Sequence, residues 1–122
     1  MGRTDNNINY SMSQSYFDRL RTATISISSS GDNEIIAAPA NGYIAIDHIN
    51  LIPTTAVSVT FKRGSTAVSG AYPLDAKQAI TLENAFHNTD GVITCLPADA
   101  FNINLGSAVQ VGGFVRYRIV GA

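Results

Sequence analysis

Hydrophobic and polar residues alternate along most of this chain, and the alternation is clearest at its centre, in residues 56–74. The apolar positions of its first half are Val57, Val59 and Phe61, with polar residues between them. Successive side chains of a strand point to opposite faces, so this period of two predicts a strand with one buried and one exposed face. A turn at Gly64 and Ser65 follows, and a second extended run toward Tyr72 completes a predicted hairpin.

The same period of two predicts further strands on both sides of the hairpin. They fall in residues 23–28, 34–38, 43–51, 79–82, 92–95, 101–105 and 109–119, and the polar residues 29–33 predict a turn. About eight or nine short strands at spacings of about ten residues, without a long helix, are typical of antiparallel two-sheet folds. The sequence therefore predicts an all-β protein, an antiparallel β-sandwich of jelly-roll-like form.

Two details of the alternation predict local irregularities. Before Asp47 the apolar residues Ile44 and Ile46 stand at even sequence positions. After His48 the apolar residues Ile49 and Leu51 stand at odd positions. A β-bulge near Asp47 and His48 would keep all four side chains inside. In the last predicted strand, Gly113 replaces a side chain at an inward position, where we expect a facing side chain to need the room.

Residues 1–21 differ in composition from the rest and predict an N-terminal arm, with the β-sandwich domain in residues 22–122. Asn, Ser and Gln dominate the arm, which makes it too polar to form its own core. Its large apolar side chains, candidates for contact with a partner, are Tyr10, Tyr16, Phe17 and Leu20. The spacing of the last three fits one face of a short helix that Ser13 would cap. Two interpretations stay open, a terminus without order and an arm that reaches a neighbouring subunit.

Composition narrows the class of protein. The 122 residues suffice for one domain that folds without a disulfide or a metal. Charged residues make up 14% of the chain, below the roughly 25% of typical soluble domains, which suggests a surface covered by partners. The net charge of −1 argues against non-specific nucleic-acid binding. With one cysteine, no signal-peptide pattern and no long apolar run, we expect a protein of a reducing cytoplasm, neither secreted nor inserted in a membrane.

Reactive residue types occur at three places, which are Asp47 with His48, His87 near Glu83 and Asp90, and Cys95. Adjacent residues of a strand point to opposite faces, so Asp47 and His48 are not expected to pair, and His48 is interpreted as a bulge residue bonded to a backbone carbonyl. His87 lacks a ligand cluster and is interpreted as part of a solvated loop. Cys95 is interpreted as a small buried hydrophobe. We therefore expect no catalytic residue, no metal and no cofactor, and a protein that is not an enzyme.

Basic residues suggest one candidate surface on the β-body. Lys62 and Arg63 would join Arg116 and Arg118 in a stripe if their strands were neighbours, with Tyr43, Tyr72 and Tyr117 interleaved. A solvated face and a subunit contact are both compatible with this pattern, whereas the net charge opposes nucleic acid. The body residues that we name as contact candidates are Lys62, Arg63 and Tyr72.

Three blocks carry a resemblance to a known group of proteins. They are SISSSGDNEIIAA, VSVTFKRGSTAVSGAYPLDA and FNINLGSAVQVGGFVRYR, and the resemblance that they carry covers residues 24–119. This succession resembles the small virion-associated β-sandwich proteins of tailed bacteriophages. Their loop before the penultimate strand tends to carry bulky aromatic residues, whereas this chain has Phe86, residues 88–91 and Cys95 there. The resemblance implies no catalytic residues and does not include the arm.

The resemblance implies a structural protein of the phage particle. We expect a capsid decoration or cement protein, assembled in the host cytoplasm, that binds the major capsid protein on the capsid surface as a homo-oligomer, with a trimer favoured. No nucleic acid, membrane or small-molecule substrate is expected as a partner. The alternative is a tail-fibre or lectin-like module that binds host glycans, for which the candidate residues are Tyr72, Phe86, Asn88 and Asp90.

Overall fold

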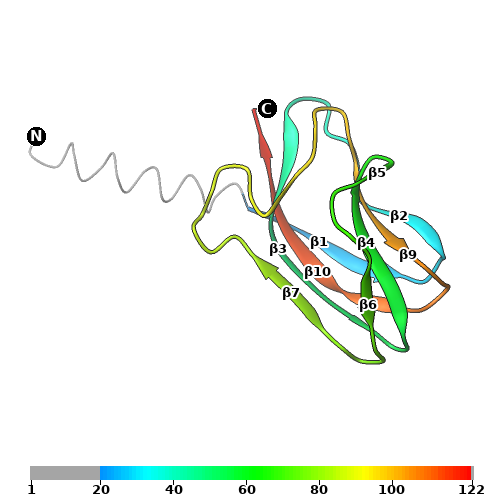
Figure 1. The fold of residues 1–122 in the computed structure, drawn as a ribbon. Coiled ribbons are helices and arrows are strands. Elements are labelled where there is room, and N and C mark those ends of the chain that lie inside the picture. The colour runs from blue at the N-terminus through cyan, green and yellow to red at the C-terminus, as the bar shows by residue number, and fades with distance from the viewer. Residues whose placement is uncertain (1–19, 122) are drawn as a thin grey trace, which may run out of the picture.

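The structure, a computed structural model, describes residues 20–121 of the chain (Figure 1). These residues form ten strands and no helix, which confirms the all-β prediction. The strands are β1 (Arg21–Ile27), β2 (Gly31–Ile36), β3 (Tyr43–Pro53), β4 (Val57–Arg63), β5 (Thr66–Ala67), β6 (Tyr72–Leu74), β7 (Ile80–Glu83), β8 (Ile93–Thr94), β9 (Phe101–Leu105) and β10 (Val111–Val120).

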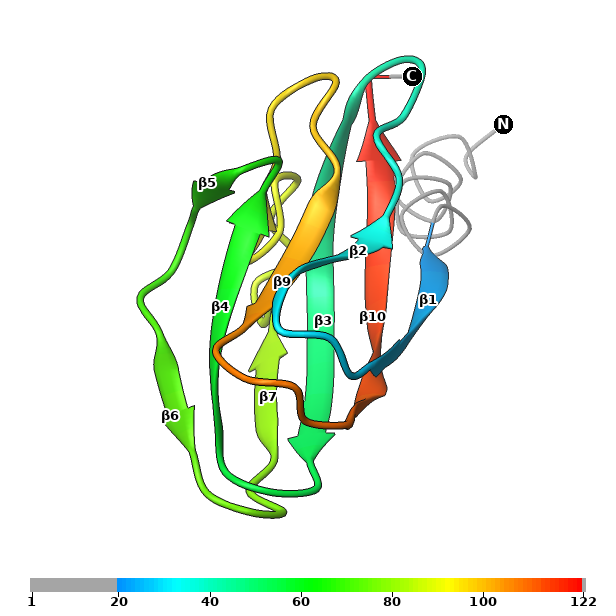
Figure 2. The same ribbon diagram turned by 90° about the vertical axis from the view of Figure 1, so that its right-hand side faces the viewer.

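The strands build two antiparallel sheets of five strands each. Sheet A has the order β1-β10-β3-β7, with β8 also paired to β3; sheet B has the order β2-β9-β4-β5, with β6 also paired to β4. Figure 2 shows the sheets as two layers, with sheet B in front of sheet A, and in Figure 1 sheet B lies to the right of sheet A. This arrangement is consistent with the predicted β-sandwich.

The core lies between the two layers and consists of the inward side chains of both sheets. In β4 the burial alternates as the sequence predicts, because Val57, Val59 and Phe61 are buried and the residues between them are not. The other buried core side chains are those of Ile25, Ile36, Ile44, Ile46, Ile49, Leu51, Leu74, Cys95, Phe101, Ile103, Leu105, Val111 and Val115. Burial of these side chains is the main favourable contribution to folding.

The predicted β-bulge is present in β3. Its partner strand β10 places Arg116 opposite His48 and Tyr117 opposite Ile46, so Asp47 is the extra residue of the bulge. The extra residue shifts the alternation by one position. As a result, the apolar side chains on both sides of Asp47 point into the core, where Ile44, Ile46, Ile49 and Leu51 are fully buried.

Several predicted bounds were wrong. Sheet pairing begins at Gly31, inside the expected turn, because the polar residues Asp32 and Asn33 face β9 and continue the ladder. The second half of the central hairpin is two short strands, β5 and β6, because the regular pairing with β4 is interrupted at residues 68–71, where the Ser69 hydroxyl accepts from the Phe61 amide. The last strand begins at Val111 rather than at residue 109.

Gly113 confirms that a position in β10 needs room, but the neighbour is backbone rather than a side chain. A Cβ atom at Gly113 would overlap the carbonyl oxygen of Asn50 and the Cα atom of Leu51 in β3. Backbone atoms in the centre of a sheet cannot move aside as a flexible side chain can. The close approach of β10 to β3 therefore depends on glycine.

Gly113→Ala is expected to lower the free energy of unfolding by about 3 kcal/mol, because the new methyl group must push two central strands apart. Urea denaturation measures this change. Gly112→Ala is the matched control, since the nearest atom to its Cβ would be the Ile25 carbonyl oxygen at 3.9 Å. Equal stability of the two variants would contradict the argument.

Candidate functional site

The predicted basic stripe does not form. Lys62 and Arg63 lie on β4 in sheet B, whereas Arg116 and Arg118 lie on β10 in sheet A. The prediction assumed that these strands were neighbours, and strand pairing is a long-range property that the alternation of residues does not contain. The two pairs of cations are thus on different layers of the protein.

The predicted stripe also required Arg118 to lie at the surface. Arg118 is instead buried in an ion pair with Asp47. The Nε atom of Arg118 donates to Asp47 Oδ2 at 2.7 Å, and its Nη2 atom donates to Oδ1 at 3.1 Å. Only 5% of Arg118 and 6% of Asp47 are exposed. Two parallel charge-assisted bonds of this kind fix the relative position of both side chains. The residue that forms the bulge in β3 is therefore bound to β10 through its side chain.

Residues 84–91 form a loop over this ion pair. Arg118 Nη2 donates to the carbonyl oxygens of Asn88 at 3.0 Å and Thr89 at 2.7 Å. Asn84, itself buried, donates to Asp47 Oδ1 and to the Asn88 carbonyl, both at 2.8 Å, and accepts from the Asn88 amide at 3.0 Å. The buried charges thus find their partners in the loop backbone, which fixes the loop on the outer face of sheet A.

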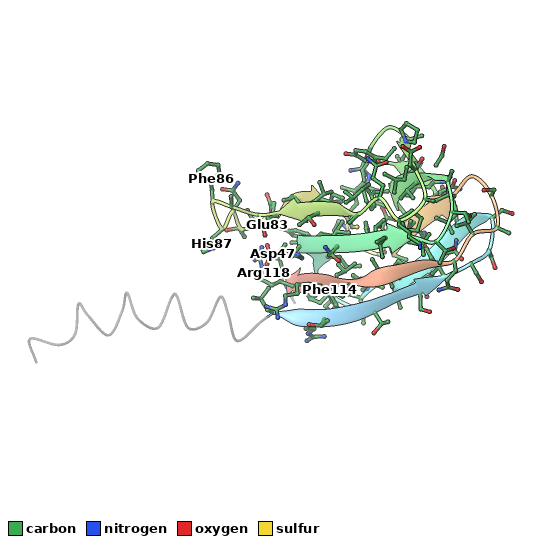
Figure 3. All side chains as sticks on the ribbon, turned by 90° about the horizontal axis from the view of Figure 1, so that it is seen from below. Asp47, Glu83, Phe86, His87, Phe114 and Arg118 are labelled. Carbon is green, nitrogen blue, oxygen red and sulfur yellow. The ribbon has the colours of Figure 1, made fainter. Side chains whose placement is uncertain are left out.

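A pocket of about 450 Å³ lies on the outer face of sheet A, beside this loop. We call it the outer-face pocket; it is lined by Leu20, Asp47, His48, Glu83, Asn84, Ala85, His87, Phe114 and Arg116. Its floor comes from β3 and β10, one wall comes from the end of β7 and the loop, and Leu20 lies just before β1. Figure 3 shows Asp47, Arg118, Glu83 and His87 gathered at one end of sheet A, with Phe114 nearby.

The pocket combines an aromatic stack with charged groups. The rings of His48 and Phe114 are parallel within 10°, with their centroids 5.2 Å apart. His48 Nδ1 lies 3.7 Å from Glu83 Oε1, directly across the β3–β7 pair, and Arg116 is the cross-strand neighbour of His48 on the other side. His48 is therefore held by ring stacking, contrary to the interpretation of a backbone carbonyl bond. Rings next to one acidic and one basic group are suited to binding a mixed apolar and polar segment.

Large apolar side chains are exposed close to the pocket. Phe86, at the tip of the loop between Ala85 and His87, is 88% exposed, and Figure 3 shows it projecting beyond the other labelled residues. Three of the five exposed large hydrophobic residues in the described part of the chain, Phe86, Val92 and Leu96, follow β7 within a short stretch. The loop thus presents an aromatic side chain to solvent from a backbone fixed by buried bonds.

The candidate glycan residues do not come together. Tyr72 lies on β6 of sheet B, whereas Phe86, Asn88 and Asp90 lie in the loop on sheet A. The polar groups of this loop bind the protein itself: Asp90 Oδ1 accepts a bond of 2.6 Å from the Tyr43 hydroxyl, and the Asp90 carbonyl accepts one of 2.7 Å from Thr94. The bond to Asp90 favours the neutral phenol and raises the pKa of Tyr43. These groups stabilise the loop.

The contact candidates of the β-body also point in different directions. Lys62 Nζ binds both carboxylate oxygens of Asp32 at 3.0 Å across the outer face of sheet B. Asn104 donates to the same carboxylate at 2.7 Å, and the bonds from Asn104 and Lys62 lower the pKa of Asp32. Tyr72 instead packs its ring against Phe61 at 5.7 Å, at the edge of the core. Lys62 and Tyr72 therefore do not form one surface. Arg63 follows Lys62 at the end of β4, opposite Phe101.

Of the four contact candidates in the arm, only Leu20 is described; Tyr10, Tyr16 and Phe17 lie outside the described residues. Leu20 is half-buried and lines the outer-face pocket of its own chain. Strand β1 begins one residue later, at Arg21. The arm therefore joins the sandwich at the pocket.

Cys95 is the buried hydrophobe that the sequence predicts, and only 1% of it is exposed. Burial raises the pKa of its thiol to about 11, a change to which the nearby Asp99 carboxylate adds. Within residues 20–121, no group of three or more acidic, histidine or cysteine side chains is placed to hold a metal ion.

Comparison with protein-family models, with curated proteins and with solved structures found no significant match to this chain. A search of the described residues for a helix long and apolar enough to cross a membrane found none.

Arg118→Met is expected to lower the free energy of unfolding by about 3 to 5 kcal/mol, because it leaves the Asp47 carboxylate buried without its cation. The loop should open as well, so chymotrypsin should cleave at Phe86 faster than in the wild type. Urea denaturation and limited proteolysis measure the two effects. Asp47→Leu combined with Arg118→Met removes both charges and should be less destabilised than the sum of the single variants. Wild-type stability of Arg118→Met would contradict the buried ion pair.

Cys95 is expected to react with an aromatic disulfide reagent at pH 8 about a hundredfold more slowly than a thiol of ordinary pKa, because two units of pKa lower the thiolate fraction by that factor. Unfolding in guanidinium should restore the normal rate.

The raised pKa of Cys95 also links stability to pH. The neutral thiol stabilises the fold fully at pH values below its ordinary pKa of 9.0, and this contribution is lost as the pH rises toward about 11. Cys95→Ala should show a shallower loss of stability in that window.

Proposed function

We propose that this chain is a structural protein of a tailed-phage particle, a decoration or cement protein that binds the major capsid protein on the capsid surface. The proposal includes a homo-oligomer of closed cyclic symmetry, a trimer. Its support is a β-scaffold whose polar side chains bind one another, together with an apolar contact surface at one end. A cement protein acts through the area that it buries and needs no reactive group.

The strand order supports the finer proposal that the sandwich is a jelly roll. Without the two-residue strands β5 and β8, the sheets have the orders β1-β10-β3-β7 and β2-β9-β4-β6. The chain thus passes repeatedly from one sheet to the other, as in the eight-stranded double-sheet jelly rolls of viral capsid and lectin domains. This architecture occurs in both capsid proteins and lectins, so the two functions are distinguished by the residues on the surface and not by the fold.

The observation that carries the proposal is the exposed Phe86 on a fixed loop. Ordering a flexible side chain or loop on binding costs free energy, and a loop already held by the Asp47–Arg118 pair avoids most of that cost. Aromatic residues are enriched in the buried centres of protein interfaces. Phe86, with Val92 and Leu96 in the same stretch, is therefore suited to insertion into a recess on the capsid shell, and the arm adds to this contact through Tyr10.

The glycan-binding alternative has less support. Tyr72 is separated from the loop by its position on the other sheet, and the Asp90 carboxylate and the backbone of Asn88 bind the protein itself. A glycan site needs polar groups that converge on a sugar, whereas this loop offers an apolar side chain at its tip. The contact surface is therefore better suited to a protein partner.

Phage heads that lack the protein are expected to bind the wild-type chain saturably. Phe86→Ser should weaken the affinity of the chain for the heads at least tenfold, as expected when a buried anchor is lost. Deletion of residues 1–19 should weaken binding further. Sedimentation of heads with labelled protein measures both effects, and light scattering gives the mass of the free oligomer.

Ile52→Ser is the matched control, because Ile52 is also an exposed apolar residue of sheet A, 44% accessible and near the far end of β3. Its affinity should equal that of the wild type. Wild-type binding by both Phe86→Ser and the deletion variant would contradict the proposal, and glycan-array binding without head binding would favour the lectin-like module.

A further inference from the structure

The outer-face pocket lies where the N-terminal arm enters the sandwich. Leu20 is part of its lining, and β1 begins at the next residue. Any path that the preceding chain takes must therefore start at the mouth of this pocket. The sequence immediately before Leu20 is Tyr16-Phe17-Asp18-Arg19.

The tether to Leu20 limits how far these residues can go. Consecutive Cα atoms are about 3.8 Å apart, so the Cα atom of Phe17 stays within about 11 Å of that of Leu20 and the Cα atom of Tyr16 within about 15 Å. This limit holds for every backbone conformation. Two aromatic side chains are thus confined to the neighbourhood of a pocket whose lining includes the stacked rings of His48 and Phe114.

The chemistry of the pocket matches the segment. Its apolar surface comes from Leu20, Ala85 and the stacked rings of His48 and Phe114. On either side of His48 the lining carries the acidic Glu83 and the basic Arg116, while the second carboxylate of the lining, Asp47, is paired with Arg118. The segment 16–19 carries two rings, one acid and one base. Offset or tilted ring contacts are favourable beyond the area that they bury, and the opposite charges set the direction of the segment.

We propose that the outer-face pocket binds residues 16 and 17 of its own chain. A short tether gives the segment an effective concentration in the millimolar range, which a separate molecule or a second copy has to exceed in order to displace it. The distal arm, residues 1–15 with Tyr10, then leaves from a fixed point beside the exposed Phe86. The inference rests on the proposed function only in treating the distal arm as a second contact with the shell.

The chain contains no tryptophan, so a single introduced indole reports its own surroundings. Tyr16→Trp and Phe17→Trp are made separately in the full chain, with Tyr10→Trp as the control in the distal arm. In at least one of the first two variants the emission should shift to shorter wavelength, and quenching by acrylamide should decrease at least threefold relative to Tyr10→Trp. Equal quenching at all three positions would overturn the proposal.

The pocket itself is tested by adding Phe114→Ser to the protected variant. Phe114 is on the outer face, and its loss leaves the core between the sheets intact, which thermal unfolding verifies. Protection of the indole should disappear, whereas Ile52→Ser in the same background should leave it unchanged. Protection that survives Phe114→Ser would place the indole elsewhere and overturn the assignment of the pocket.

A disulfide distinguishes the chain's own arm from that of a second copy. Phe17→Cys combined with Ala85→Cys should form an intrachain bond on mild oxidation, seen as a monomer of altered mobility on a non-reducing gel. Cys95 is buried with its pKa raised to about 11, so it does not compete. A cross-linked dimer would overturn the assignment to the same chain and show exchange of arms. All measurements use the free protein, so the outcome is independent of whether phage heads bind it.

Discussion

The ion pair between Asp47 and Arg118 determines the shape of one whole end of this protein. Removing two charges from water costs more free energy than their attraction returns unless their remaining hydrogen-bonding atoms are also satisfied. Here the loop of residues 84–91 supplies those partners through Asn84 and through backbone carbonyls. Arg118 neutralises the charge of the bulge residue Asp47. This ion pair fixes the conformation of the loop, and with it the pocket beside the loop and the position of Phe86.

Polar residues in the rest of the described chain serve the same purpose on a smaller scale. Lys62, Asp32 and Asn104 connect three strands across the outer face of sheet B, and Tyr43 fixes Asp90 at the base of the loop. In the described residues, no buried side-chain nitrogen or oxygen lacks a hydrogen-bond partner. Side chains that are used in this way give rigidity, and a rigid scaffold with exposed apolar residues is suited to assembly.

The sequence was sufficient for the properties that depend on neighbouring residues. The alternation in β4, the bulge at Asp47, the crowding at Gly113 and the burial of Cys95 were all predicted, because each is visible in a short stretch of residues. The ion pair of Asp47 with Arg118 was missed, since its partners are 71 positions apart and their meeting depends on the pairing of β3 with β10. The false basic stripe had the same cause. The signal that would have helped is a carboxylate placed at a predicted bulge, where a buried charge needs a cation.

The broken edge of sheet B bears on how copies of the chain can associate. Strand β4 is covered by two short pieces, β5 and β6, and between them the Ser69 hydroxyl takes the place of a ladder partner by accepting from the Phe61 amide at 3.0 Å. Pro73 in β6 has no amide hydrogen to offer. An incoming strand therefore finds no continuous row of donors and acceptors along this side. Amyloid-like growth of sheet B by addition of a strand is disfavoured at this edge, and copies that meet here do so through side chains.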